Sequence, residues 1–177
     1  MTNLDLEVEK YLKDDRHLLE DMRSYFASLT LENAVDEASK GLNPNSTINS
    51  HQHRVGRKRG EAAAIEMSKF ILELRTCKSF EDIFQITERV KNDVFRLGDL
   101  WSYDTALRIG FALNFLPTMV YVQRGVVKGV EKALNEKMPR ARFISLTSLP
   151  KEIQRLKPYQ AENFLCIWGR GKTSKIC

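Results

Sequence analysis

The chain has 177 residues and a formal net charge of +5, with 42% hydrophobic and 29% charged residues. This length and composition favour one globular domain with its own core and argue against long disordered stretches. The sequence has no apolar run of about 18 residues and no apolar leader, so we expect no membrane span, no secretory signal and no membrane partner, and we predict a cytoplasmic protein. Its three cysteines lie far apart and lack a histidine cluster at ligand spacing, so we predict no metal and no cofactor.

Charge is distributed unevenly along the chain. Residues 1–40 contain ten Asp or Glu and five Lys or Arg, whereas residues 41–177 contain thirteen acidic and twenty-three basic residues. A basic body suits a polyanionic partner, although Lys and Arg also cover ordinary solvated helices. The charge makes nucleic acid a candidate partner without identifying it.

The N-terminal part of the chain has the pattern of two helices. Apolar residues recur at intervals of three and four over residues 4–29, which predicts one long helix with a core-facing stripe and Asn3 as its cap. A second helix is predicted over residues 31–40, because Thr30 suits its N-cap and Gly41 suits a left-handed stop.

Residues 42–59 have no apolar period and are rich in Asn, Ser, Pro and Gly, which predicts a loop of the length seen in functional or mobile segments. The loop ends in a group of basic residues, Arg54, Arg57, Lys58 and Arg59, directly before a helix expected to begin near residue 61. Because backbone N–H groups at a helix start add partial positive charge, this group could hold a phosphate. A solvated basic turn is the alternative. His51 and His53 have no carboxylate or thiol beside them and make a weak ligand set for a metal.

The rest of the chain is predicted to be helical, which makes the fold class all-α, a single compact multi-helix domain. The predicted helices cover residues 61–75, residues 80–97 after a Ser79 cap, residues 102–114, a segment from residue 117 or 124 to 134, and residues 149–156 and 158–168. The face of the first of these that we expect to be buried consists of Ala62, Ile65, Phe70, Ile71 and Leu74. Residues 119–122 are also β-branched enough for a short strand.

Residues 97–129 form the long stretch in which glycine, aromatic, apolar and charged residues are closely interleaved. Within it Asp104, beside Tyr103 and four residues before Arg108, suits a pocket carboxylate held by an ion pair along one helix face. In the alternative, Asp104 favours a first helical turn and forms a surface pair with Arg108 that stabilises the helix by about 0.3 to 0.5 kcal/mol. The aromatic residues Trp101, Tyr103 and Tyr121 either stack on an extruded base or belong to the core.

Arg124, Lys128 and Lys132 recur at four-residue spacing. On one helix they form a single basic stripe suited to a phosphate backbone. The alternative is an ordinary exposed helix face.

Several of these residues carry a resemblance to a known family. The run over residues 105–109, then Pro117-Thr118 and an apolar segment leading into Arg124, resembles the helix-hairpin-helix and following helix of DNA glycosylases of the endonuclease III superfamily. The ending over residues 162–170 is similar to the last core helix of that group. The blocks 103–110 and 116–129 also resemble a group of bacterial proteins without an assigned function, and the resemblance covers about the last eighty residues.

The departures from the family bear on its chemistry. Leu100 and Ser102 stand where such glycosylases have the glycines of their phosphate-binding hairpin. Asp104 falls near the attacking lysine of the bifunctional members, and Val122 falls near the aspartate that assists base loss. A carboxylate cannot replace an amine nucleophile, and valine can neither activate water nor stabilise a cation. The four-cysteine cluster of many members is also missing. The resemblance therefore implies a degenerate helix-hairpin-helix scaffold without glycosylase chemistry.

Together these patterns predict a DNA-binding protein on a glycosylase-like helical scaffold. One alternative is an enzyme that acts on a nucleotide or nucleic acid through Asp104, Tyr103 and Arg108. The other is a protein-interaction module in which the acidic N-terminal helix covers a partner or the basic face of its own chain.

Overall fold

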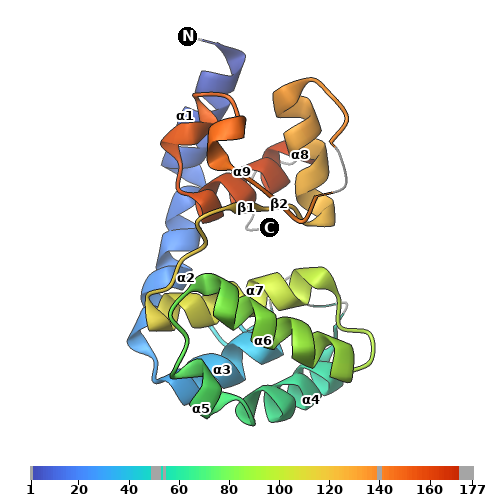
Figure 1. Ribbon diagram of the computed structural model, residues 1–177. Helices are drawn as coiled ribbons and strands as arrows, with labels where there is room; N and C mark the ends of the chain where they lie inside the picture. Colours follow the sequence, from blue (N-terminus) through green and yellow to red (C-terminus); the bar gives the residue numbers. More distant parts are fainter. Residues whose placement is uncertain (1, 49–52, 54, 139–140, 172–177) are drawn as a thin grey trace. The chain divides into compact units, whose positions relative to one another are not determined.

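The computed structural model describes residues 2–48, 53, 55–138 and 141–171, and it confirms an all-α fold (Figure 1). The helices are α1 (Asn3–Asp14), α2 (Arg16–Ser28), α3 (Leu31–Lys40), α4 (Arg57–Ser68), α5 (Ile71–Leu74), α6 (Phe80–Asp93), α7 (Asp99–Leu113), α8 (Arg124–Leu134) and α9 (Pro158–Gly169). Two short strands, β1 (Val120–Tyr121) and β2 (Phe143–Ile144), pair antiparallel with Val120 opposite Ile144. Two single 3₁₀ turns, η2 (Leu146–Ser148) and η3 (Ile153–Arg155), precede α9. None of the described helices has the length and apolar character needed to cross a lipid bilayer.

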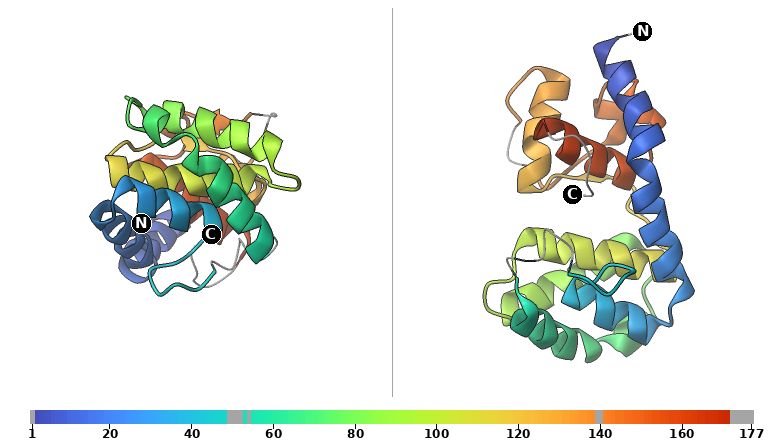
Figure 2. Two further views of the ribbon diagram at one scale, coloured as in Figure 1. Left: turned by 90° about the horizontal axis from the view of Figure 1, so that it is seen from below. Right: turned by 180° about the vertical axis from the view of Figure 1, so that it is seen from behind.

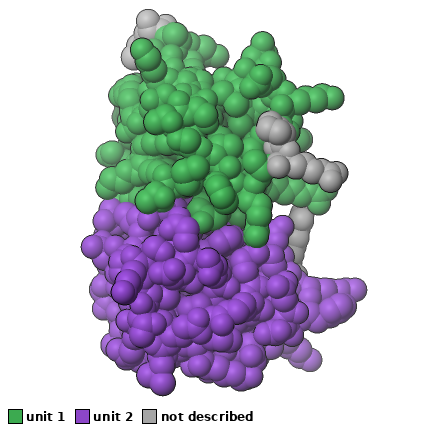
Figure 3. All heavy atoms as spheres, viewed as in Figure 1, with its two compact units in different colours: residues 1–21, 118–177 green, residues 22–117 purple. Residues whose placement is uncertain are grey.

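The contacts of the chain group it into two compact units, shown in Figure 3. Unit 1 consists of residues 1–21 and 118–177, and unit 2 consists of residues 22–117. The first and last helices of the chain belong to unit 1, where α1 packs on α9. Helix α2 contains the residue at which the chain passes from one unit to the other.

The local start and stop signals of two helices in unit 2 are where the sequence predicts them. Thr30 caps α3 through its hydroxyl, and Gly41 ends it with a left-handed φ of 69°. At the start of α6 the Asp82 amide donates to Ser79 Oγ at 3.2 Å, while the Ser79 amide donates to Asp82 Oδ2 at 3.0 Å. This capping box leaves the α6 start with few unsatisfied backbone donors. The Lys78 amide, which donates to Asp82 Oδ2 at 2.9 Å, and the hydrogen bonds with Ser79 hold the pKa of Asp82 below its usual value.

Helix α7 is the centre of unit 2, where it packs against both α3 and α6. Two polar contacts fix it among apolar neighbours. The indole Nε1 of Trp101 donates to the Ser39 carbonyl at 2.9 Å, and the hydroxyls of Thr87 and Ser102 lie 2.9 Å apart. Because these groups are buried and paired, they help specify one orientation of α7.

The predicted helix over residues 61–75 is wrong in its extent and in part of its buried face, although Leu74 is buried as expected. Helix α4 begins at Arg57 and ends at Ser68, and α5 is a separate turn. Ile65 is 67% exposed and Ala62 is exposed, whereas Ala63, Ala64 and Met67 are buried. The reason is the close approach of α4 to α3, since a Cβ at Gly60 would lie 3.1 Å from the Lys40 Cα. A face of small residues fits that approach, and the larger Ile65 is left in solvent.

Residues 4–29 form two helices rather than the predicted single one. The core-facing stripe is present, with Val8, Tyr11, Leu19, Met22 and Phe26 buried. The continuity is broken at the buried residue Asp15, whose carbonyl accepts from the Leu18 amide at the start of α2. Burial raises the pKa of the Asp15 carboxyl. The N-cap of α1 is Thr2, not Asn3, because Thr2 and Asp5 form a reciprocal capping box.

In the last third of the chain, the structure decides between two open alternatives and corrects one expectation. The last of the expected helices before residue 135 begins at Arg124 rather than at Pro117, and it is α8. Val120 and Tyr121 form the short strand that the sequence allowed as an alternative. The expected helix over residues 149–156 is replaced by η2 and η3. Leu149, Ile153 and Leu156 are still part of the core of unit 1. A 3₁₀ turn has about three residues, so side chains three or four positions apart still point to the same side of the chain.

Candidate nucleic-acid interface

Three cations lie on one exposed face of α8. We call Arg124, Lys128 and Lys132 the α8 row; each is exposed, while Val126, Gly129 and Val130 turn to the core. Side chains four residues apart share a helix face, so the row forms a continuous basic stripe. Within the described part of the chain, none of the three forms an ion pair, so no described carboxylate neutralises these charges at close range.

Helix α8 lies directly against α9, as Figure 1 and the right-hand view of Figure 2 show. A Cβ at Gly129 would lie 2.7 Å from the carbonyl carbon of Leu165, and one at Gly169 would lie 2.7 Å from the Gly129 Cα. Real Cβ atoms do not approach backbone this closely. Glycine at both positions therefore allows the two helix backbones to touch.

This crossing places two further residues, Trp168 and Arg170, beside α8. The ammonium Nζ of Lys132 lies 3.8 Å from the centroid of the Trp168 ring. At the other end, a Cβ at Gly125 would lie 3.0 Å from Arg170 Cζ, so the exposed Arg170 guanidinium stands beside the first turn of α8. Sequence reasoning did not include Trp168 or Arg170 in the site. The signal that could have found them is the set of glycines at positions 125, 129 and 169, which predicts a close helix crossing.

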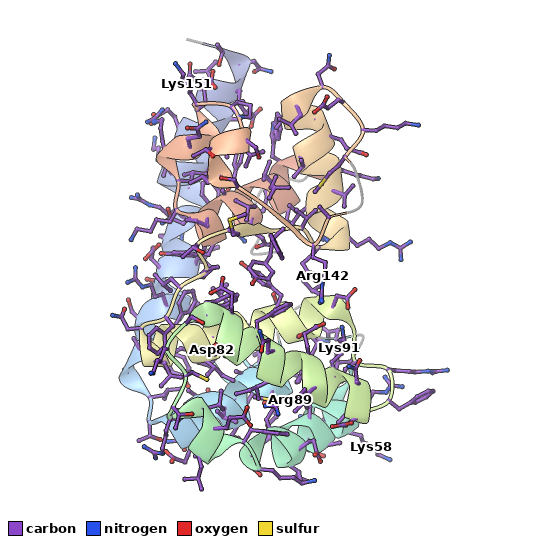
Figure 4. The ribbon with its side chains drawn as sticks, in the orientation of Figure 1. Lys58, Asp82, Arg89, Lys91, Arg142 and Lys151 are labelled. Atoms are coloured by element: carbon purple, nitrogen blue, oxygen red, sulfur yellow. The ribbon has the colours of Figure 1, made fainter. Side chains whose placement is uncertain are left out.

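The second basic group lies in unit 2, on the first turn of α4. Arg57 and Lys58 are exposed, and Figure 4 shows Lys58 at this end of the helix. Arg59 donates from Nη1 to the Val55 carbonyl at 2.9 Å and is half-buried. The N-cap Gly56 supplies no side-chain cap and the first turn of the helix has no acidic residue, so positive side chains stand at the positive end of the helix dipole. Arg54 and His51 lie outside the described residues.

The segment that resembles a helix-hairpin-helix consists of α6, a connector over residues 94–98, and α7. Leu100 and Ser102, in the places of the hairpin glycines, lie inside α7, and the Ser102 amide donates to the Gly98 carbonyl at 3.2 Å. The Asp99 carboxylate, 2.7 Å from Lys91 Nζ, stands at the start of α7. A backbone amide that is already bonded and a neighbouring carboxylate both disfavour a phosphate here.

Asp104, Tyr103 and Arg108 lie together on α7 but largely inside unit 2. Tyr103 is 1% exposed and Arg108 is 2% exposed, whereas Asp104 is half-buried. The expected surface pair is therefore wrong for Arg108. Burial lowers the pKa of the Arg108 guanidinium, and the charge of Asp104 partly opposes this.

The guanidinium of Arg108 lies 5.8 Å from the centroid of the Phe26 ring. Its Nε and Nη1 atoms are buried and have no hydrogen-bond partner among the described residues. Trp101 and Tyr121 are buried, and Tyr103 packs edge-on to Phe80 with ring centroids 6.0 Å apart. This placement supports the core interpretation of these aromatic residues.

No protein-family model, curated protein or solved structure matches the chain. In the described ranges, no group of three or more His, Cys, Asp or Glu side chains is placed to hold a metal ion.

Proposed function

We propose that the chain binds nucleic acid, DNA in the first place, through the α8 row extended by Arg170. The observation that carries the proposal is the exposure of these cations on one surface of unit 1 without acidic partners among the described residues. Successive cations of the row are about 6 Å apart along the helix, so the row spans about 12 Å. The phosphates of one DNA strand advance by about 3.4 Å along the duplex axis, so this span faces about three or four of them.

The charge of the surrounding chain supports the same partner. Residues 118–177 contain twelve Lys or Arg and four Asp or Glu. The acidic residues of unit 1 are concentrated in its N-terminal segment, where Asp5 and Glu9 of α1 pair with Arg155. Because α1 neutralises Arg155 rather than the α8 row, the row keeps its charge for a polyanion. This contact also matches one form of the interaction-module alternative, in which the acidic helix covers basic residues of its own chain.

The glycosylase-like scaffold remains part of the proposal. Its support is the order of the elements, in which α6, a short connector and α7 are followed by an extended segment and then α8. The binding proposal does not depend on the hairpin, since its amides and Asp99 disfavour a phosphate. The enzyme alternative has less support, because Tyr103 and Arg108 are buried and offer little surface to a substrate.

Replacing Arg124, Lys128 and Lys132 together with alanine is expected to weaken duplex DNA binding at least tenfold at low salt. The slope of the logarithm of the binding constant against the logarithm of salt concentration should become flatter by about 2 to 3 units, because each neutralised phosphate contributes about 0.9. Fluorescence anisotropy with a labelled duplex over a salt series measures both. An exposed row contributes little to stability, so the melting temperature should stay near that of the wild type.

The matched control removes the same charge from another exposed surface of unit 1. Lys10, Lys13 and Arg16 are exposed on α1 and at the start of α2. The variant with alanine at all three positions should keep most of the wild-type slope of the logarithm of the binding constant against the logarithm of salt concentration. Equal loss in both variants would show that only net charge matters, and salt-insensitive binding by the wild type would contradict the proposal.

The purified protein is expected to form no borohydride-trapped adduct with an abasic site and to release neither uracil nor oxidised bases from duplex DNA. The reason is that Asp104 and Val122 stand where the resemblance implies a lysine and an aspartate, so the amine nucleophile and the assisting carboxylate are missing. Gel analysis of labelled duplexes after reduction measures this. A trapped adduct would show that another amine, such as that of Lys128, attacks the sugar, and would favour the enzyme alternative.

A further inference from the structure

We propose that Trp168 is a stacking platform for an unpaired base, and that the nucleic acid bound by the α8 row is therefore single-stranded at this point. The inference rests on the proposed function and specifies its ligand. Proteins that bind single strands combine cations along the backbone with aromatic rings on which bases stack. The α8 row with Trp168 has both parts in direct contact.

The indole is held in a defined orientation. Trp168 is near the C-terminal end of α9, and it is partly exposed while it packs against the core of unit 1. Its ring stacks on the buried Phe164, with centroids 5.6 Å apart and planes 15° from parallel. A ring supported in this way presents a flat apolar surface at little cost in conformational entropy.

The cation over this ring belongs to the α8 row. Lys132 Nζ lies 3.8 Å from the indole centroid, so the ammonium covers part of the ring in the free protein. The lysine stem is long and rotatable, and its head is exposed. An exposed cation over an aromatic ring is a weaker interaction than a stacked base, so a base can take its place on the indole. The ammonium then remains within reach of the phosphate that follows the base.

The helix crossing places the ring and the row on one ligand path. Gly129 and Gly169 bring the two backbones into contact, and the same crossing has Trp168 beside the last cation of the row and Arg170 beside Gly125 in the first turn of α8. A base inside a duplex has both faces covered by its neighbours and cannot use the indole. The structure therefore favours single strands over intact duplex.

The two tryptophans of the chain make a direct test possible. Trp101 is buried and bonded to Ser39, so an added ligand does not reach it, whereas Trp168 is accessible. Titration of the wild type with a single-stranded oligo-dT is expected to quench the accessible part of the tryptophan fluorescence, because a stacked base lies on the indole. A duplex of equal length should bind with much less quenching. Binding of both ligands without quenching would overturn the stacking inference and leave the proposed function standing, whereas binding of neither at low salt would overturn the proposed function itself.

Variants of Trp168 separate stacking from packing. Trp168→Leu is expected to lower the affinity for oligo-dT about tenfold and to leave the duplex affinity within about twofold, since one stacked base is lost. Trp168→Phe keeps a ring and should recover most of the oligo-dT affinity while it removes the fluorescence response. Circular dichroism confirms that each variant is folded. Equal losses for both ligands in the folded Leu variant would show that Trp168 only supports the packing of α9, and would overturn the inference.

Discussion

A Gly129→Ala variant is expected to lose about 3 kcal/mol or more of unfolding free energy, enough to disorder the C-terminal part of unit 1. The added Cβ would lie 2.7 Å from the Leu165 carbonyl carbon and 2.9 Å from its Cα. Both atoms belong to the backbone of α9, so neither can rotate away. The helices must separate, and their separation opens the core that contains Val126, Val130 and Phe164. Urea unfolding followed by circular dichroism measures the loss.

Gly125→Ala on the same helix is the matched control. Its Cβ would meet the end of the Arg170 side chain and, at 2.9 Å, the Cys166 sulfur. The guanidinium can swing into solvent, and alanine favours a helix interior by up to about 1 kcal/mol over glycine, so the loss should be smaller than for Gly129→Ala even though the buried Cys166 sulfur must shift. A Gly129→Ala protein as stable as the wild type would mean that the backbones of α8 and α9 are not in contact.

Replacing Arg108 with methionine is expected to stabilise the protein by about 1 to 4 kcal/mol. The guanidinium is 2% exposed, and its Nε and Nη1 atoms have no hydrogen-bond partner in the described ranges of the chain. Among the described residues, the charge of Asp104 and the Phe26 ring, 5.8 Å from the guanidinium, offset part of its desolvation. A buried charge with few hydrogen bonds costs more in desolvation than it recovers, whereas methionine fills a similar volume without that cost.

The control for this prediction is Arg124→Met, which changes an exposed arginine and should shift stability by less than about 0.5 kcal/mol. Both variants are compared by urea unfolding in the same buffer. Loss of stability in Arg108→Met would contradict the expectation and show that the guanidinium is better satisfied than its contacts indicate. Unchanged DNA binding by the folded Arg108→Met protein would agree with the position of Arg108 outside the α8 row.

Features that depend on neighbouring residues could be predicted from the sequence. Thr30 and Gly41 mark the two ends of α3 correctly and Ser79 marks the start of α6, because a cap forms between groups that are at most a few residues apart. The same is true of the α8 row, whose shared face follows from four-residue spacing once the helix exists. The all-α class follows from the apolar periods of these segments.

Features that depend on distant residues could not be predicted in this way. Ile65 was expected inside and is exposed, because the face of α4 is chosen by the fit of Gly60 against Lys40. The Asp104 and Arg108 spacing suits a surface pair, yet α7 is packed on nearly all sides, and its arginine is buried with it.

The candidate interface is the feature that could be predicted least completely from the sequence. Trp168 and Arg170 join the α8 row because α8 and α9 cross at Gly129 and Gly169, which are separated by forty positions in the sequence. A periodic pattern reports which face of one helix is apolar, but it contains no information on which other helix covers that face or how closely. That choice is made by the packing of side chains and backbones that come together only when unit 1 folds.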